Sequence, residues 1–155
     1  MNKLYQTTLM QLAVLCEGHT NSTDLLNAVK KEVSMVDTAE SRFRPKGNTQ
    51  EVRLYKTLHL TRAFDTSLET FLSIYGKVPS DMRKHTIAGY AYSLTNPSGL
   101  FHPLDGITKK IIVDDIASAR NKFMHKANSY PSKTEFNKLE NKICTSFQVV
   151  LTLKK

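Results

Sequence analysis

Apolar side chains recur three and four residues apart along most of this chain, and that spacing places them on one face of an α-helix. Short segments rich in glycine, proline and serine separate these stretches. No part of the chain has the sequence pattern expected of a β-strand. The pattern therefore predicts an all-α protein, a single-domain helical bundle of about five helices over residues 1–155 with short connecting loops. The stretches with helical spacing are 4–16, 25–39, 52–75, 112–127 and 136–151.

Residues that favour helix ends lie between these stretches. Gly18 is expected to end the first helix, because glycine tolerates the left-handed conformation found after a helix C-terminus. Ser22 or Thr23 can cap the second helix. The proline and glycine within residues 43–48 predict a turn, after which a long third helix starts at Thr49.

The segment 77–106 is the least regular part of the chain, since it contains three prolines and three glycines. We expect a short helix from about Ser80 to Ser93, followed by a loop. Loops of this length are often functional, so His102 is a candidate for the rim of a site.

A further helix is expected from about Thr108 to Ser129, and its residues divide into two faces. The apolar face is expected to contain Ile112, Ile116, Ala119, Phe123 and Ala127. The opposite, polar face is expected to contain Asp114, Ser118, Asn121 and His125. Pro131 ends this helix, and Ser132 with Glu135 forms a predicted capping box for the last one.

Arg120, Asn121 and His125 on this helix are residue types suited to phosphodiester chemistry. A guanidinium can clamp a phosphate through two parallel hydrogen bonds, and an imidazole can move a proton near neutral pH. Both Arg120 and His125 are expected to lie off the apolar face. On an ideal helix, residues five apart differ by about 140° and rise roughly 7.5 Å, so the two side chains point in different directions. Either a bend or unwinding of the helix near Met124 to Tyr130, or the pairing of two chains through these helices, would bring them together.

The segment 118–130, with Arg120-Asn121 and then His125, resembles the signature of the HEPN superfamily of all-helical ribonucleases. That signature is an arginine, often followed by Asn or Asp, and a histidine four to six residues after the arginine. The resemblance covers roughly residues 111–151, with helix content alone in common before that. Some members carry a tyrosine two residues after the histidine that a partner enzyme modifies, whereas this chain has Ala127 there.

The resemblance implies RNA cleavage without a metal ion, yielding a 2′,3′-cyclic phosphate and a 5′-OH. His125 would be the general acid or base, Arg120 would stabilise the transition-state phosphate, and Asn121 would orient the phosphate or the imidazole. Lys122 and Lys126 would attract the RNA backbone. The family usually forms its active groove between two paired domains, which implies a homodimer with this helix at or beside the interface.

Charge is consistent with a nucleic-acid partner. The net charge is +8, and more than half of that excess lies in the last third of the chain, around Arg120 and His125. A basic surface attracts polyanions, although this excess does not distinguish RNA from DNA.

Neither a metal nor a cofactor is expected. Asp114 and Asp115 are adjacent, so they point about 100° apart on a helix and form no paired carboxylate site. Cys16 and Cys144 are far apart and read as two buried thiols in a reducing compartment. With neither a transmembrane stretch nor a convincing leader peptide, we expect a cytoplasmic protein.

Three classes of function stay open at this point. The first is a HEPN-type endoribonuclease acting as a toxin or phage-defence effector, with a possible antitoxin or defence-system partner protein. The second is a non-catalytic HEPN-like module that binds a nucleotide or a partner protein, with Arg120 as a phosphate anchor. The third is a helical adaptor with no role in nucleic-acid chemistry.

Overall fold

The stretches with helical spacing form helices in the computed structural model, which describes residues 3–19, 22–43, 49–97 and 99–155. Within these ranges there is no strand, apart from a single antiparallel bridge between Phe101 and Lys154, so the all-α class is confirmed. The helices are α1 (Lys3–Cys16), α2 (Thr23–Phe43), α3 (Thr49–Tyr75), α4 (Ile87–Leu94), α5 (Gly106–Lys110), α6 (Ser118–His125) and α7 (Lys133–Thr152). A π-helical segment, Ile111–Ala117, joins α5 to α6 without a break. Counting 106–125 as one helix, the described residues form six helices, one more than expected.

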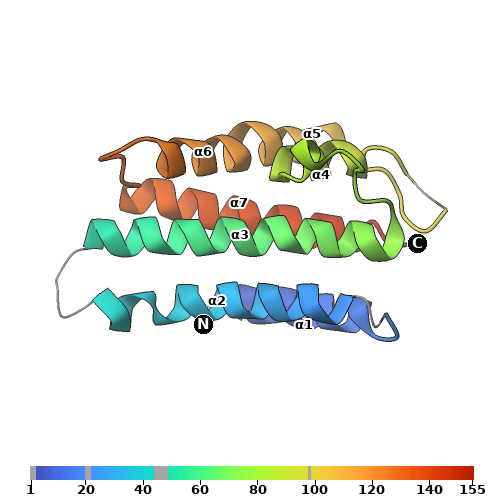
Figure 1. The fold of residues 1–155 in the computed structure, drawn as a ribbon, viewed down its shortest axis with the longest axis horizontal. Coiled ribbons are helices and arrows are strands. Elements are labelled where there is room, and N and C mark those ends of the chain that lie inside the picture. The colour runs from blue at the N-terminus through green and yellow to red at the C-terminus, as the bar shows by residue number, and fades with distance from the viewer. Residues whose placement is uncertain (1–2, 20–21, 44–48, 98) are drawn as a thin grey trace.

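The helices lie nearly parallel to the long axis of the molecule, in three layers (Figure 1). α1 and α2 form one outer layer, α3 and α7 form the middle layer, and α4 with α5–α6 forms the other outer layer. The middle layer therefore contacts both outer layers, and α3 packs against α2, α4, α6 and α7. A side chain on α3 can thus face either the α1–α2 layer or the α4–α6 layer.

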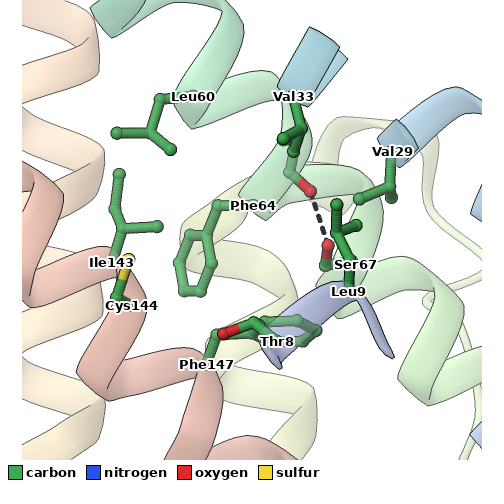
Figure 2. Close-up of a pocket in the computed structure, with 11 residues that line it drawn as sticks. Thr8, Leu9, Val29, Val33, Leu60, Phe64, Ser67, Ile143, Cys144 and Phe147 are labelled. Atoms are coloured by element: carbon green, nitrogen blue, oxygen red, sulfur yellow. Dashed lines mark hydrogen bonds between the residues drawn. The ribbon is translucent and has the colours of Figure 1, made fainter. Parts of the chain in front are cut away.

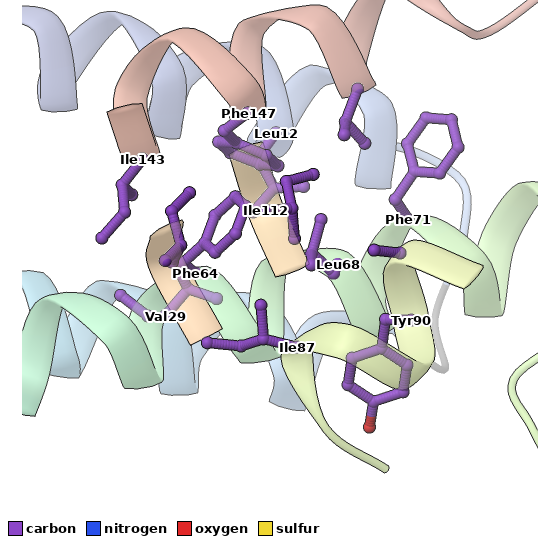
Figure 3. Packing of buried hydrophobic residues seen from close by; sticks show 14 of the residues in the cluster. Leu12, Val29, Phe64, Leu68, Phe71, Ile87, Tyr90, Ile112, Ile143 and Phe147 are labelled. Carbon is purple, nitrogen blue, oxygen red and sulfur yellow. The ribbon is translucent and has the colours of Figure 1, made fainter. Parts of the chain in front are cut away.

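The apolar stripes predicted from the sequence meet in one hydrophobic core between these layers (Figure 3). Each helix contributes to the core through residues three or four apart, as expected for amphipathic helices. The largest side chains with less than 2% exposure include Leu12, Leu68, Phe71, Ile112 and Ile116. The core therefore includes both α1 and the helix 106–125, more than ninety residues apart in the sequence.

The predicted end of the first helix and the predicted capping box of the last one are confirmed. Gly18 follows α1 with a φ of 78°, the left-handed conformation that glycine adopts without steric cost. Before α7, the Ser132 side chain accepts from the Glu135 backbone N–H, and the Glu135 carboxylate accepts from the Ser132 backbone N–H, so the capping box is present. The predicted turn at 43–48 lies almost wholly outside the described residues.

The helix expected over residues 80–93 is shorter and later than predicted. A 3₁₀ turn, Met82–Lys84, is capped by Asp81, and α4 then starts after Thr86, whose backbone is extended. Gly89 lies so close to this turn that a Cβ atom there would be 2.0 Å from the Lys84 carbonyl oxygen. This close approach allows α4 to fold back against α3, and it requires glycine at position 89.

The π segment widens one part of the helix 106–125. In a π-helix each backbone N–H bonds to the carbonyl five residues earlier, and such segments are frequent at functional sites. The Ser118 hydroxyl follows the same spacing, lying 3.5 Å from the Val113 carbonyl oxygen. The described helix also ends at His125, four residues before the expected end, because Lys126 has an extended backbone.

The core contains a small cavity between α1, α2, α3 and α7, with a volume of about 40 Å³ (Figure 2). Its walls are mainly apolar, and the nearby Ser67 hydroxyl donates to the Ala63 carbonyl at 2.7 Å. Small-molecule sites usually have volumes of about 300–1,000 Å³, so this cavity is a packing gap within the core. Among the described residues, no helix is both long enough and apolar enough to cross a membrane.

Candidate functional site

The polar face predicted for the helix 106–125 is confirmed. Asp114, Ser118, Asn121 and His125 are all exposed, while Phe123 is 6% exposed and faces the core. Asn121 and His125 are four residues apart on α6, so their side chains project from the same side. The predicted apolar face holds through Phe123 but ends there, because Ala127 lies after the end of the helix and is exposed.

Arg120 lies on a different side of α6 from His125, and it is half-buried. Its Nε atom is buried and has no hydrogen-bond partner in the described structure. Arg120 therefore flanks the apolar face, and its position three residues before Phe123 turns it toward the α3 side of the helix. Within one chain, Arg120 and His125 do not converge.

Arg120 instead belongs to a polar cluster between α3, α4 and α6, which we call the Asp65 cluster. Its members are Asp65, Glu69, His85, Tyr90 and Arg120. Burial raises the pKa of Asp65 to about 6, and the adjacent negative charge of Glu69 acts in the same direction. The positive charge of Arg120, and to a lesser extent that of His85, opposes this rise. Asp65 Oδ1 is also buried without a hydrogen-bond partner.

The α4 side of the Asp65 cluster is held by hydrogen bonds and packing. The His85 ring donates through Nε2 to the Pro79 carbonyl oxygen at 2.6 Å, and it packs 6.0 Å from the Tyr90 ring. Burial, followed by the charges of Glu69 and Asp65 and a hydrogen bond to Glu69, raises the pKa of the Tyr90 hydroxyl. Tyr90 is therefore a neutral hydrogen-bond donor at physiological pH.

The two predicted RNA-contacting lysines have different surroundings. Lys122 Nζ lies 3.0 Å from Glu135 of α7 and 4.8 Å from the centre of the Phe123 ring, so it links α6 to α7. Hydrogen bonds from the Ser132 backbone and from Lys122 lower the pKa of Glu135 to about 2. Lys126 is exposed beyond the end of α6, next to His125.

His102 does not lie near this site. It precedes α5, and the helix 106–125 separates it from His125. A helix of that length spans about 30 Å, so the suggestion that His102 forms part of the rim is wrong. Its backbone N–H donates to the Leu153 carbonyl near the end of the chain.

Sequence reasoning missed the residues of α3 and α4 that surround Arg120. Asp65 and Glu69 are four residues apart on α3. Each directly follows a core residue, Phe64 and Leu68 respectively, and the next core residues are Phe71 and Leu72. Two carboxylates at helical spacing beside a buried stripe are a signal that a search of α3 could have used. Nothing in the local pattern predicted that Arg120 would be their neighbour.

The Asp65 cluster and the polar face of α6 together offer a guanidinium, an exposed imidazole, an amide and a carboxyl group with a raised pKa. In the part of the chain that the structure describes, no three His, Cys, Asp or Glu side chains are placed to share a metal ion. Comparisons of this chain with models of protein families, with curated proteins and with solved structures find no match.

Proposed function

We propose that this chain is a HEPN-type endoribonuclease that cleaves RNA without a metal ion. The observation that carries the proposal is the exposure of Asn121 and His125 on one side of α6, with the Arg120 guanidinium on the adjoining side and Lys126 beyond the helix end. These side chains match the Arg-Asn and His elements of the HEPN signature. We further propose that the enzyme acts as a toxin or phage-defence effector, controlled by a partner protein.

In the proposed reaction, a base removes the proton from a ribose 2′-OH, and the 2′ oxygen attacks the adjacent phosphorus. The bond from phosphorus to the 5′ oxygen breaks, and that oxygen takes up a proton. The products are a 2′,3′-cyclic phosphate and a 5′-OH. His125 transfers one of these protons, Arg120 stabilises the negative charge that builds up on the phosphate, and Asn121 orients the reacting groups.

A homodimer is part of this proposal. Arg120 and His125 lie on different sides of one α6 helix, so a single chain does not present both to one phosphate. Two chains related by a twofold axis would place Arg120 of one chain near His125 of the other. We therefore expect α6 to lie at or beside the interface, and light scattering at micromolar concentration to give the mass of a dimer.

A second candidate is a non-catalytic module that binds a nucleotide or a partner protein. The half-burial of Arg120 beside Asp65 favours this alternative, because a guanidinium held next to a carboxylate has less freedom to follow a reacting phosphate. In that case Arg120 would anchor a phosphate group without cleavage.

Incubation of the purified protein with RNA in EDTA distinguishes the two candidates. The nuclease is expected to release fragments with cyclic-phosphate and 5′-OH ends, and His125→Ala is expected to slow cleavage about a hundredfold or more. His102→Ala is the matched control, since that histidine is exposed but distant from α6. Arg120→Lys keeps the charge next to Asp65 and loses the planar fork, so it should also slow cleavage while the protein stays folded.

Two results would contradict the proposal. One is a folded His125→Ala variant that cleaves RNA at the wild-type rate. The other is cleavage that stops in EDTA and returns when magnesium or manganese is added, because the proposed reaction uses no metal ion.

A further inference from the structure

A groove of about 380 Å³ lies between the N-terminal half of α3 and the C-terminal end of α6. Tyr55 of α3, Phe123 and Met124 of α6, and Tyr130 from the turn after α6 contribute to its walls. Glu51, in the first turn of α3, adds a carboxylate to an otherwise apolar lining. Tyr130 is the most accessible of the three rings, since it is 38% exposed, whereas Phe123 is 6% exposed and the Tyr55 ring packs 4.3 Å from the His59 ring.

The turn that carries Tyr130 is fixed against α3. The Arg53 side chain donates through Nε to the Pro131 carbonyl oxygen at 2.7 Å, and Pro131 is buried. Asn128 turns the chain with a φ of 57°, in the left-handed region that asparagine tolerates. The turn is thus anchored to α3 directly after Tyr130, which is itself 38% exposed.

The position of the groove relates it to Arg120. Met124 follows Arg120 by one helical turn, so the two side chains project from the same side of α6. On α3, the groove residues come before Asp65, which lies beside Arg120. The α6 wall of the groove therefore begins within about one helical turn of Arg120, while Leu58, the last of its α3 residues, lies seven residues before Asp65.

The lining fits the chemistry of a nucleobase. Proteins that bind single-stranded RNA stack its bases on aromatic side chains and read the base edges through hydrogen bonds. A carboxylate accepts from an exocyclic amino group, as acidic side chains do with the amino group of cytosine. Adenine, cytosine and guanine carry such a group, whereas uracil has only its ring N3–H to donate on that edge. The groove is also at the small end of the usual range for ligand sites, about 300–1,000 Å³, which suits a single base.

We propose that this groove is a nucleobase subsite, in which a base with an exocyclic amino group packs against Tyr130 and Tyr55 and donates to Glu51. The assignment of that base to the RNA strand cleaved at Arg120 and His125 rests on the proposed function. Binding of the base itself does not depend on cleavage. The subsite would give the enzyme a preference among RNA sequences, since strands with uracil at this position would bind less tightly.

The test is a titration of the full chain with CMP, AMP, GMP and UMP, in which changes in the NMR chemical shifts of the protein measure binding. Tyrosine fluorescence provides a second signal, because the chain has 6 tyrosines and no tryptophan. We expect the three amino-bearing nucleotides to bind more tightly than UMP. Tyr130→Ala should weaken their binding about tenfold or more through the loss of stacking, and Glu51→Gln should abolish the discrimination against UMP.

Tyr92→Ala is the matched control, because Tyr92 is 53% exposed on α4 and has Lys109 over its ring, outside the groove. This variant should bind all four nucleotides as wild type does. Thermal unfolding of each variant confirms that it is folded before its binding is interpreted.

Three results would overturn the subsite: no nucleotide binds, all four bind equally, or Tyr130→Ala leaves binding unchanged. Conversion of a dimer to a monomer by Tyr130→Ala, with nucleotide binding unchanged, would also overturn it and would identify the groove as an interface between two copies. Failure of the proposed function gives a different pattern, since nucleotides would still bind in the groove while RNA stays intact. Cleavage of RNA that is insensitive to Tyr130→Ala, with nucleotide binding weakened as expected, would overturn only the assignment of the bound base to the cleaved strand.

Discussion

Replacement of Asp65 by asparagine is expected to stabilise this protein at neutral pH. Burial raises the pKa of Asp65 from 3.8 to about 6, even though Arg120 and His85 lower it. The ionised carboxylate is therefore less favourable in the folded protein than in the unfolded chain. Asparagine has nearly the same shape, has no charge to desolvate and can still hydrogen-bond within the cluster.

The sign of the pH dependence follows from this raised pKa. Between about pH 4 and pH 6 the unfolded chain has released this proton while the folded protein still holds it, so the stability of the wild type falls as the pH rises. A difference of about two pKa units corresponds to about 3 kcal/mol. Asp65 is partly exposed, so solvent screening reduces the expected gain for Asp65→Asn to about 2 kcal/mol above pH 6. Below about pH 4 the gain disappears, because the carboxyl group is protonated in both states.

Thermal unfolding followed by circular dichroism at about pH 7.5 and about pH 4 measures this effect. For a chain of this length, a gain of about 2 kcal/mol raises the Tm by about 4–8 °C. Asp115→Asn is the control, because Asp115 pairs with Lys142 at 2.9 Å on the surface and should change stability by about 0.5 kcal/mol or less. The reasoning fails if Asp65→Asn lowers the Tm near pH 7.5, or if its effect is the same at both pH values.

Further predictions concern packing and helix ends, each measured by denaturant or thermal unfolding. Phe123→Ala should destabilise the protein by about 3–5 kcal/mol, because the ring is 6% exposed and its loss leaves a cavity. Gly89→Ala should cost about 1–3 kcal/mol, since the added Cβ would lie 2.0 Å from the Lys84 carbonyl oxygen. Gly106→Ala, where the Cβ meets open space at the start of α5, should instead be neutral or stabilising by up to about 1 kcal/mol. Ser132→Ala should lower the free energy of unfolding by about 1 kcal/mol through the loss of the α7 capping box. Equal effects of Gly89→Ala and Gly106→Ala, or an unchanged Tm for Phe123→Ala, would contradict this account.

The helices could be predicted from the sequence because their apolar stripes are regular and their ends carry strong local signals. Gly18 and Ser132 act within a few residues of their own positions, so a local pattern was enough to place them. The start of α4 was missed because it depends on the contact of Gly89 with the Lys84 carbonyl, which the hydrophobic spacing does not reveal. The π segment was missed for a similar reason, since Ile112 and Ile116 are also at ordinary α-helical spacing.

The candidate site was predictable in part. The exposure of Asn121 and His125 followed from helical spacing, and the same spacing could have placed Arg120 next to Phe123 and hence toward α3. Its neighbour Asp65 lies 55 residues earlier in the chain, in a stretch of α3 that otherwise reads as core. Contacts of that sequence separation come from the packing of layers, which no local pattern specifies.

The π segment Ile111–Ala117 gives the long helix 106–125 one place where its length can change. A wide turn accommodates about one residue more than an α-helical turn, so the loss of one residue there would convert it to ordinary α-helix. The residues that follow would then keep nearly the same orientation. A deletion within α6 would instead rotate the following residues by about 100° and turn Phe123 away from the core. The protein should therefore tolerate deletion of a residue in the π segment far better than deletion one turn further along the same helix.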